Sequence, residues 1–254
     1  MSVLNRLAIV AMSLAFALVP ASPRAEDTAP SFSPAQTEAV NKLIHDYLLN
    51  NPQVLVEAIE HADAANKAAA EQAIKTEIVN RHEELDNDPT SPVLGNPQGD
   101  VTVVEFFDYR CPYCKATAPA VARLLEQDKK VRLVMKEFPI LGKESVFASR
   151  VAFVAQKHGK YAEFYKAMFD LKTTINEEST MEVAKSIGLD PEMVKKEMES
   201  ADIDTFTKNN FDLAKAIGVE GTPAFVIGDA LSPGTINTDQ LKFQIEALRS
   251  KMKG

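Results

Sequence analysis

Apolar residues from position 101 onward form two kinds of pattern, namely short continuous runs typical of buried strands and stripes at helical spacing. Val101 to Phe107 and Val131 to Phe138 are near-continuous apolar runs, as in strands buried on both faces. Helical spacing fills about 143–217, and strand character returns at Ala224 to Ile227. The pattern ends with a turn at Ser232-Pro233-Gly234, which permits a hairpin, and a helix from about Thr238 to Lys251. This order predicts an α/β fold with one central sheet and helices on its faces.

Residues 26–85 carry a different pattern, with two narrow apolar stripes at helical spacing. A capping box at Ser33-Pro34-Ala35-Gln36 predicts a helix over about 34–49. Asn51-Pro52 ends this helix and starts a second one with heptad spacing. The second helix forms either a coiled-coil contact with a thin, alanine-rich seam or a lone spacer helix. Such stripes cannot fold alone, so we expect them to dock on the main domain or on copies of themselves.

Two further segments mark the ends of the domains. Residues 86–99 hold three prolines and two glycines, which predicts a linker before a main domain over about 92–254. Residues 1–25 place one Arg before a thirteen-residue apolar stretch, too short to span a bilayer, and then small residues. We interpret them as a secretory signal cleaved after Ala21 or Ala25, and an uncleaved anchor is the alternative.

Charge and cysteine content narrow the class of protein. Removing residues 1–25, which hold two Arg and no acid, changes the formal charge from -8 to -10. A chain this acidic is not expected to bind nucleic acid or to lie on anionic lipid. Outside the cytoplasm disulfides persist, but a chain with two cysteines does not use disulfides as scaffolding.

Those two cysteines form the motif Cys111-Pro112-Tyr113-Cys114, between the first strand and a helix that runs to about Gln127. A disulfide stabilises most when it closes a long loop, and this one would close a loop of two residues, so we interpret the pair as a redox centre. Cys111 stands where the helix dipole and free N–H groups favour a thiolate. We therefore expect Cys111 to attack and Cys114, one turn further on, to resolve the mixed disulfide.

A metal site is the competing interpretation of the Cys-x-x-Cys motif. A structural zinc ion needs four ligands, and the chain has no third cysteine. The histidines all lie at least 29 residues from the pair in sequence, at His45, His61, His82 and His158. The sequence therefore predicts no metal site.

Residues 104–114 (Val-Glu-Phe-Phe-Asp-Tyr-Arg-Cys-Pro-Tyr-Cys), Lys136 to Leu141 and Gly221 to Phe225 together resemble the DsbA-like branch of the thioredoxin superfamily. The resemblance covers about 92–254 and implies a thioredoxin fold with a helical insertion over about 143–217. The N-terminal region resembles the helical extension of ScsC-like members, which are bacterial periplasmic disulfide isomerases or reductases. That resemblance implies a homo-oligomer, with a trimer favoured.

The resemblance also implies roles for particular residues. Pro223 is expected to be cis and, with Thr222, to face Cys111, with the Thr222 backbone free to pair with a substrate strand. Glu105 stands where the family keeps a buried acid, so we expect a raised pKa and proton exchange with Cys114. The alternative is a structural ion pair between Glu105 and Lys136. The aromatic stripe that includes Tyr161 and Tyr165 is interpreted as core packing.

The favoured function is an oligomeric disulfide isomerase or reductase whose partners are cysteine-containing proteins and a membrane redox protein, with no cofactor beyond its own dithiol. A monomeric dithiol oxidase, with its N-terminal helices folded back on the main domain, is the first alternative. Sequestration of copper(I) on the two soft thiolates is the second. Glutaredoxins share Cys-Pro-Tyr-Cys but are short and cytosolic, which the signal segment and the insertion argue against.

Tyr113 predicts the redox character of the pair. Strongly oxidising members of the family carry His at this position, where it stabilises the thiolate, so we expect this protein to be a milder oxidant. Equilibration with glutathione buffers measures the reduction potential, which should lie well below roughly -120 mV, the strongly oxidising end of the range. A potential at that end would contradict the prediction.

Overall fold

The computed structural model describes residues 32–253, which fall into two compact units that divide between His61 and Ala62. The first unit contains α1 (Pro34–Asn50) and the start of α2 (Pro52–Asn80), and the second contains the rest of α2 and the whole sheet. The predicted signal segment, residues 1–25, lies outside the described residues. Among the described helices, none combines the length and the apolar character needed to cross a membrane.

The two N-terminal helices form as predicted. Ser33 Oγ accepts a hydrogen bond from the Gln36 N–H, and the Gln36 side chain accepts one from the Ser33 N–H, which completes the capping box. No residue of α1 is buried, and Ile78 is the one buried residue of α2. The apolar stripe is therefore exposed in the single chain, at Val40, Leu43, Ile44, Tyr47, Leu55 and Ile59.

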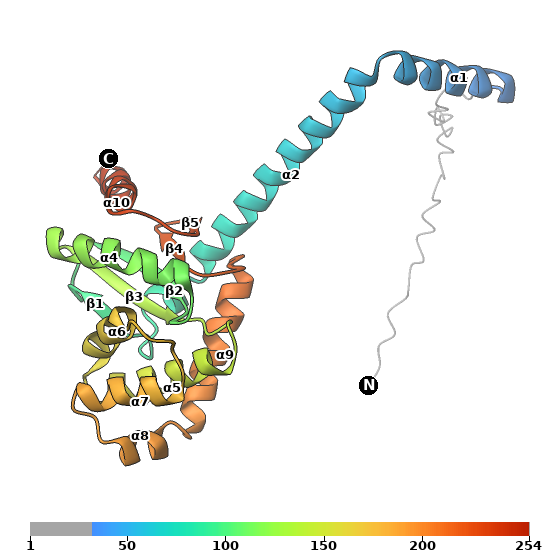
Figure 1. Cartoon of the computed structure of the whole chain (residues 1–254). Helices are drawn as coiled ribbons and strands as arrows, with labels where there is room; N and C mark the ends of the chain where they lie inside the picture. The colour runs from blue at the N-terminus through green and yellow to red at the C-terminus, as the bar shows by residue number, and fades with distance from the viewer. Residues whose placement is uncertain (1–31, 254) are drawn as a thin grey trace, which may run out of the picture. The chain divides into compact units, whose positions relative to one another are not determined.

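The second unit is built on a five-stranded mixed sheet with the order β1-β3-β2-β4-β5 (Figure 1). The central strand β2 pairs in parallel with β3, and the remaining pairs are antiparallel. The two predicted apolar runs become β2 and β3, which explains why both lack alternation. The strand bounds are Val93–Gly95 (β1), Val101–Phe107 (β2), Val131–Glu137 (β3), Ala224–Ile227 (β4) and Ala230–Pro233 (β5).

Helices cover both faces of this sheet. The face that carries Val103 and Phe107 packs on α4 (Pro112–Gln127), α10 (Thr238–Met252) and the insertion. The opposite face, with Val104 and Phe106, packs on the end of α2, on α3 and on α9. Figure 1 shows the insertion helices gathered beside the sheet. The remaining bounds are His82–Asp86 (α3), Lys143–Lys157 (α5), Tyr161–Asp170 (α6), Glu177–Ser186 (α7), Pro191–Glu197 (α8) and Ala201–Ala216 (α9).

The structure differs from the predicted boundaries in two places. Residues 86–99 are not only a linker, because Val93–Gly95 adds an edge strand to β3 and the preceding helices pack on the sheet through Ile78 and Leu85. The division between the compact units accordingly falls earlier, within α2. The hairpin turn lies at Gly228-Asp229, where Gly228 adopts a positive φ of 63°, and not at 232–234.

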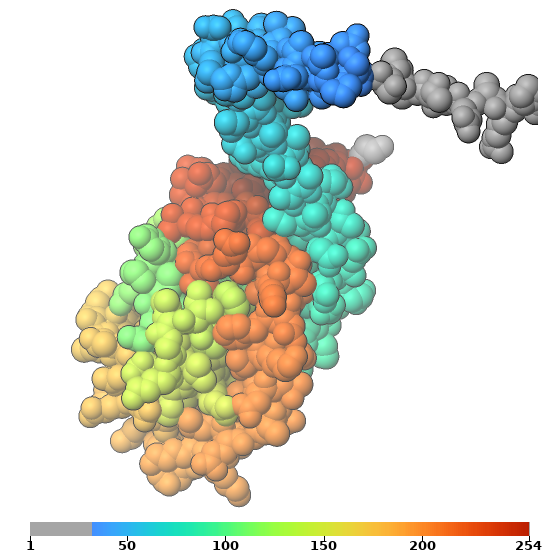
Figure 2. Space-filling view, turned by 90° about the vertical axis from the view of Figure 1, so that its right-hand side faces the viewer, coloured from blue at the N-terminus to red at the C-terminus, as the bar shows by residue number. Residues whose placement is uncertain are grey.

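The C-terminal half of α2 belongs to the second unit. Figure 2 shows its turquoise surface beside the orange and red surface of α9 and the β4–β5 hairpin. Lys75 forms an ion pair of 2.7 Å with Asp229 of the hairpin turn. Gly218 permits the close approach, because a Cβ at that position would meet the Ile74 side chain at 3.1 Å.

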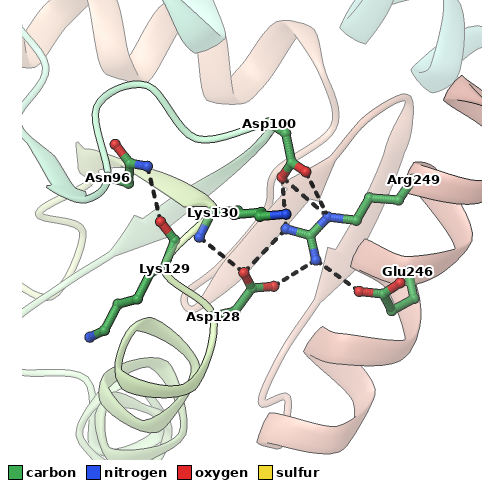
Figure 3. Close-up of polar contacts among 7 residues, drawn as sticks. All are labelled: Asn96, Asp100, Asp128, Lys129, Lys130, Glu246 and Arg249. Carbon is green, nitrogen blue, oxygen red and sulfur yellow. Dashed lines mark hydrogen bonds and ion pairs between the residues drawn. The ribbon is translucent and has the colours of Figure 1, made fainter.

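An arginine on α10 ties three segments of the second unit together (Figure 3). Arg249 donates hydrogen bonds to Asp100, before β2, to Asp128, after α4, and to Glu246 on its own helix. The guanidinium side chain is only 12% exposed. Hydrogen bonds from Arg249 hold the pKa of Asp128 below its ordinary value of 3.8.

A second polar cluster lies in the core beside the insertion. Glu137, at the end of β3, is buried, and its Oε1 accepts hydrogen bonds from the hydroxyls of Tyr109 at 3.1 Å and Tyr161 at 3.0 Å. The Asn210 side chain donates to the Glu137 backbone carbonyl at 3.0 Å. Burial raises the pKa of Glu137 from its ordinary value of 4.5 to about 8. This cluster joins the segment before the active-site helix to β3 and α6.

We predict that Arg249→Leu lowers the free energy of unfolding by about 1–3 kcal/mol at pH 7, because two aspartates lose charged hydrogen bonds. Glu246→Ala removes only the exposed partner and should cost under about 0.5 kcal/mol. Since the pKa of Asp128 is lowered in the folded chain, the difference between Arg249→Leu and wild type should shrink as pH falls below 3.8. Urea titrations over this pH range measure both effects, and equal losses in the two variants would contradict the role of Arg249.

We predict that Glu137→Gln removes a pH-dependent loss of stability. The folded chain holds the Glu137 proton up to about pH 8, whereas the unfolded chain loses it near 4.5, so stability falls as pH rises between these values. The wild type should lose about 1.4 kcal/mol per pH unit relative to the variant across this window. Glu126→Gln, on the exposed face of α4, is the control and should follow the wild type. Parallel pH dependences of Glu137→Gln and wild type would show that Glu137 is ionised in the folded chain.

Candidate active site

The two cysteines lie at the start of α4, directly after β2. Cys111 is the N-cap residue, Pro112 is the first residue of the helix, and the Lys115 N–H donates to the Cys111 carbonyl at 3.1 Å. Both thiols are free. Cys111 is 3% exposed and Cys114 is fully buried, whereas Tyr113 between them is 64% exposed. Cys111 is the more accessible of the two thiols, but it is more enclosed than a residue at a helix start would suggest.

The loop before β4 covers Cys111. The Thr222–Pro223 peptide bond is cis, and the Cys111 sulfur lies 3.2 Å from the Thr222 carbonyl oxygen. The Gly234 N–H donates to the Pro223 carbonyl at 2.8 Å, which fastens this loop to the end of β5. The structure therefore brings together Cys111, Thr222 and Pro223 from positions more than one hundred residues apart in the chain.

Asp108 organises the turn between β2 and α4. Its carboxylate accepts hydrogen bonds from the N–H groups of Arg110 at 2.8 Å and Leu141 at 3.0 Å, and its carbonyl accepts one from the Cys111 N–H. The Arg110 guanidinium binds Glu144 and the Leu141 carbonyl. This role of Asp108 was not predicted from the sequence. An aspartate directly after a strand is a common signal for a side chain that caps a turn, and could have indicated this role.

Glu105 lies in the middle of β2 on the face that packs against α4, and it is completely buried. Its Oε2 accepts a hydrogen bond from the Tyr165 hydroxyl at 3.4 Å, and its Oε1 has no protein partner among the described residues. Burial raises the pKa of Glu105 from 4.5 to about 8. Burial likewise raises the pKa of Cys114, and the charge on Glu105 adds to this, so the two groups interact.

Lys136 does not pair with Glu105, which corrects the alternative drawn from the sequence. In the parallel pairing, Glu105 lies beside Met135 and Phe106 lies beside Lys136, so the acid and the amine point to opposite faces of the sheet. The Lys136 amine instead donates to the Glu84 carbonyl at 2.7 Å, to Ser91 at 2.8 Å and to Asp88 at 3.0 Å. Lys136 therefore anchors the segment before β1 rather than the active site.

Two open grooves flank the β4–β5 hairpin next to the cis-proline loop. One, of about 750 Å³, is bounded by that loop, by the hairpin and by Glu71, Ile74 and Lys75 of α2. The other, of about 710 Å³, runs from Leu231 to Phe243. Both offer apolar and backbone surface for an extended polypeptide. Among the described residues no group of three or more His, Cys, Asp or Glu is placed to hold a metal ion, which leaves the two thiols as a soft ligand pair.

The arrangement can carry out thiol–disulfide exchange. A thiol at a helix start lies against a backbone carbonyl, a second thiol lies one turn deeper, and a buried acid lies close enough to influence that second thiol. Sequence reasoning missed Tyr165 as a polar contact, because the stripe that contains it has the spacing of a packed helix face. Tyrosines in such a stripe are a usable signal, since a buried hydroxyl usually finds a partner.

Comparison with known proteins agrees with this geometry. Residues 102–246 match the DSBA-like thioredoxin domain, and residues 36–69 match the copper resistance protein ScsC N-terminal domain. The structure of a thioredoxin-like oxidoreductase from Silicibacter pomeroyi DSS-3 is 43% identical and covers 66% of this chain and 97% of its own, with a TM-score of 0.65.

Two further relatives extend the comparison. Proteus mirabilis ScsC in a transitional conformation is 30% identical and covers 87% of this chain and 100% of its own, with a TM-score of 0.63. A probable disulfide bond formation protein D from Bacillus anthracis is 31% identical over 171 residues, 62% of this chain and 77% of that protein. The first domain match spans more than half of the chain, and the site has the dithiol that such proteins use, so the chain belongs to the DsbA-like thioredoxin-domain family of thiol–disulfide oxidoreductases.

Proposed function

We propose that the chain reduces and reshuffles disulfides of client proteins in the periplasm, as a homo-oligomer that works through Cys111 and Cys114. The observation that carries this proposal is the 3.2 Å approach of the free Cys111 thiol to the Thr222 carbonyl. A sulfur held against a backbone edge can meet a client disulfide while that backbone pairs with the client chain. The two grooves beside the hairpin supply surface for the residues that flank the client cysteine.

In the proposed reaction Cys111 attacks as a thiolate, aided by its position at the start of α4. Attack on a client disulfide forms a mixed disulfide and releases one client thiolate. Cys114 then attacks the Cys111 sulfur, which completes reduction, or a client thiolate attacks instead, which completes isomerisation. Glu105 takes the proton that Cys114 must lose, because it is the buried acid that interacts with that thiol.

The choice of isomerase or reductase over oxidase rests on the N-terminal helices. The apolar side chains of α1 are exposed in the single chain, with Leu43 69% exposed, and an exposed stripe of this kind is covered most simply by the same stripe on another copy. Residues 36–69 also match the ScsC N-terminal domain, and the resemblance to ScsC-like proteins favours a trimer. Isomerisation requires reduced thiols, and assembly can shield these thiols from a membrane oxidase.

The periplasmic location rests on two supports. Residues 1–25 have the composition of a secretory signal, cleaved after Ala21 or Ala25, and the family to which the chain belongs works on disulfides, which persist in oxidising compartments. A membrane redox protein is the proposed source or acceptor of electrons. Copper(I) binding by the two thiols remains a second function that the ScsC N-terminal match favours.

We predict that Leu43→Glu with Ile44→Glu converts the oligomer to a monomer, because the two carboxylates cannot be buried in an apolar contact. Reactivation of a scrambled-disulfide protein should fall by about tenfold or more as the active sites cease to act together. Reduction of a simple disulfide by the same variant should be unchanged. Sedimentation velocity and the two activity assays measure these effects.

His45→Glu, on the opposite side of α1, is the matched control and should keep both mass and activity. Cys111→Ser should lose both activities without a change in mass. If the stripe variant keeps the mass and the isomerase activity of the wild type, the oligomeric proposal is wrong. A stripe variant that is monomeric but introduces disulfides efficiently would favour the monomeric oxidase.

A further inference from the structure

Only one of the two carboxyl oxygens of Glu105 has a hydrogen-bond partner among the described residues. The group is fully buried, Oε2 accepts from Tyr165, and Oε1 has no protein partner among the described residues. Leaving a buried polar atom unpaired is unfavourable, so most such atoms have a partner in folded proteins. Glu105 lies on the sheet face that packs with Cys114, and its charge raises the pKa of that thiol.

The ring of Tyr165 is fixed by its aromatic neighbours. It packs edge to face on Phe107 at 5.3 Å and on Phe169 at 4.8 Å, and it stacks on Tyr161 at 6.3 Å, measured between ring centroids. These contacts come from β2 and from α6 itself, so they set the direction of the hydroxyl. Tyr165 is only 8% exposed, and Glu105 is the acceptor that its hydroxyl reaches.

We propose that Tyr165 is a positioning residue for Glu105: its hydroxyl occupies Oε2, so that Oε1 is the oxygen that takes the proton from Cys114. The inference rests on the proposed proton role of Glu105 and assigns the atom and the residue that selects it. In a neutral carboxyl group the carbonyl oxygen is the better acceptor. A donor fixed at Oε2 therefore makes Oε2 the carbonyl oxygen and leaves the proton on Oε1.

The proposed step balances as follows. In the mixed disulfide between Cys111 and a client, Cys114 gives its thiol proton to Oε1 of ionised Glu105. The Cys114 thiolate attacks the Cys111 sulfur, a new sulfur–sulfur bond forms, and the bond to the client sulfur breaks. The client sulfur leaves as a thiolate and takes a proton from water, so the client is reduced and the cysteine pair is oxidised.

Two properties of the hydrogen bond between the Tyr165 hydroxyl and Glu105 Oε2 suit a positioning role for Tyr165. The hydroxyl donation opposes the effect of burial on the pKa of Glu105, which lies at about 8. The 3.4 Å separation is long for a hydroxyl donor, and bonds to charged acceptors are shorter, so we expect the contact to tighten when Glu105 ionises. Tyr165 thereby favours the ionised form that accepts the proton.

Among the residues that the structure describes, Tyr165 is the single hydrogen-bond donor to Glu105. Lys136 of β3 points to the opposite face of the sheet. Cys114 comes from α4 and donates no hydrogen bond to Glu105, whose Oε1 has no partner among the described residues. Beyond Tyr165 lies the separate cluster of Glu137 from β3 with Tyr109 and Tyr161.

Tyr161 offers a matched control. It lies one turn before Tyr165 on α6, it is equally buried, and its hydroxyl donates to Glu137 and not to Glu105. Tyr→Phe at either position removes one buried hydroxyl from the same helix and keeps the ring packing. A difference between the two variants therefore reports the contact with Glu105 and not a general loss of a tyrosine.

The experiment uses the full mature chain, loaded as a mixed disulfide with a fluorescent cysteine peptide, and follows peptide release by stopped flow between pH 5 and 10. In wild type the release rate should rise with a midpoint near 8. Tyr165→Phe should move the midpoint to higher pH by about one unit, which lowers the rate about tenfold below the midpoint. Tyr161→Phe should follow the wild type, and Glu105→Gln should lack this transition.

Infrared difference spectra give a second readout that does not depend on exchange. The carbonyl band of protonated Glu105, identified by its loss in Glu105→Gln, should move to higher frequency in Tyr165→Phe because its hydrogen bond is gone. A Tyr165→Phe variant with the midpoint and the band of wild type would overturn the inference. If Glu105→Gln keeps the wild-type pH profile, the proton role itself fails, whereas the band still decides whether Tyr165 contacts Oε2.

Discussion

The site depends on β2 being buried on both faces in the middle of the sheet. Because side chains alternate along a strand, Glu105 is sent to the face under α4, and Phe106 to the face under α3 and α9. The same strand then ends in the turn that Asp108 caps, which delivers Cys111 to the start of α4. One strand thus positions Glu105, the turn and the Cys111 sulfur together, and a slip of one residue in its pairing would exchange the two faces.

The features that could be predicted from the sequence are those that local pattern or a motif determines. The apolar run Val101–Phe107 forms a strand over the predicted residues, the cysteine motif starts a helix, and Pro223 follows a cis bond that faces Cys111. The partners of buried polar groups could not be predicted in this way. Lys136 and Glu105 are close in the sheet, yet a register that the sequence does not display sends them to opposite faces.

The same limit explains the other differences. Tyr165 reaches Glu105 across 60 positions of sequence, and its helical spacing indicates only that the ring is buried. Val93 and Leu94 lie in a segment rich in proline and glycine, where three residues are enough for an edge strand but too few to show a period. The turn at Gly228-Asp229 competes with a stronger turn signal four residues later, and the pairing of β4 with β5 decides between them.

The two buried glutamates, Glu105 and Glu137, differ in how well their carboxyl groups are hydrogen-bonded. Glu137 has two tyrosine donors on one oxygen, whereas Glu105 has one long contact and an unpaired oxygen. An apolar side chain at either position would stabilise the fold more, since buried ionisable groups cost free energy. The less satisfied of the two is the one beneath the cysteine pair. Of these two glutamates, the one with fewer hydrogen bonds is therefore the one to which the proposed reaction assigns a proton transfer.

The Lys136 anchor gives the polypeptide a mechanical property. Its ammonium group is held by a carbonyl, a hydroxyl and a carboxylate from residues 84–91, and it is buried under them. Separating that segment from the sheet would break three hydrogen bonds to a charged group, and each such bond contributes about 1.5–3 kcal/mol. The Lys136 anchor therefore resists separation of the segment before β1 from the sheet, in addition to the apolar packing of Ile78 and Leu85.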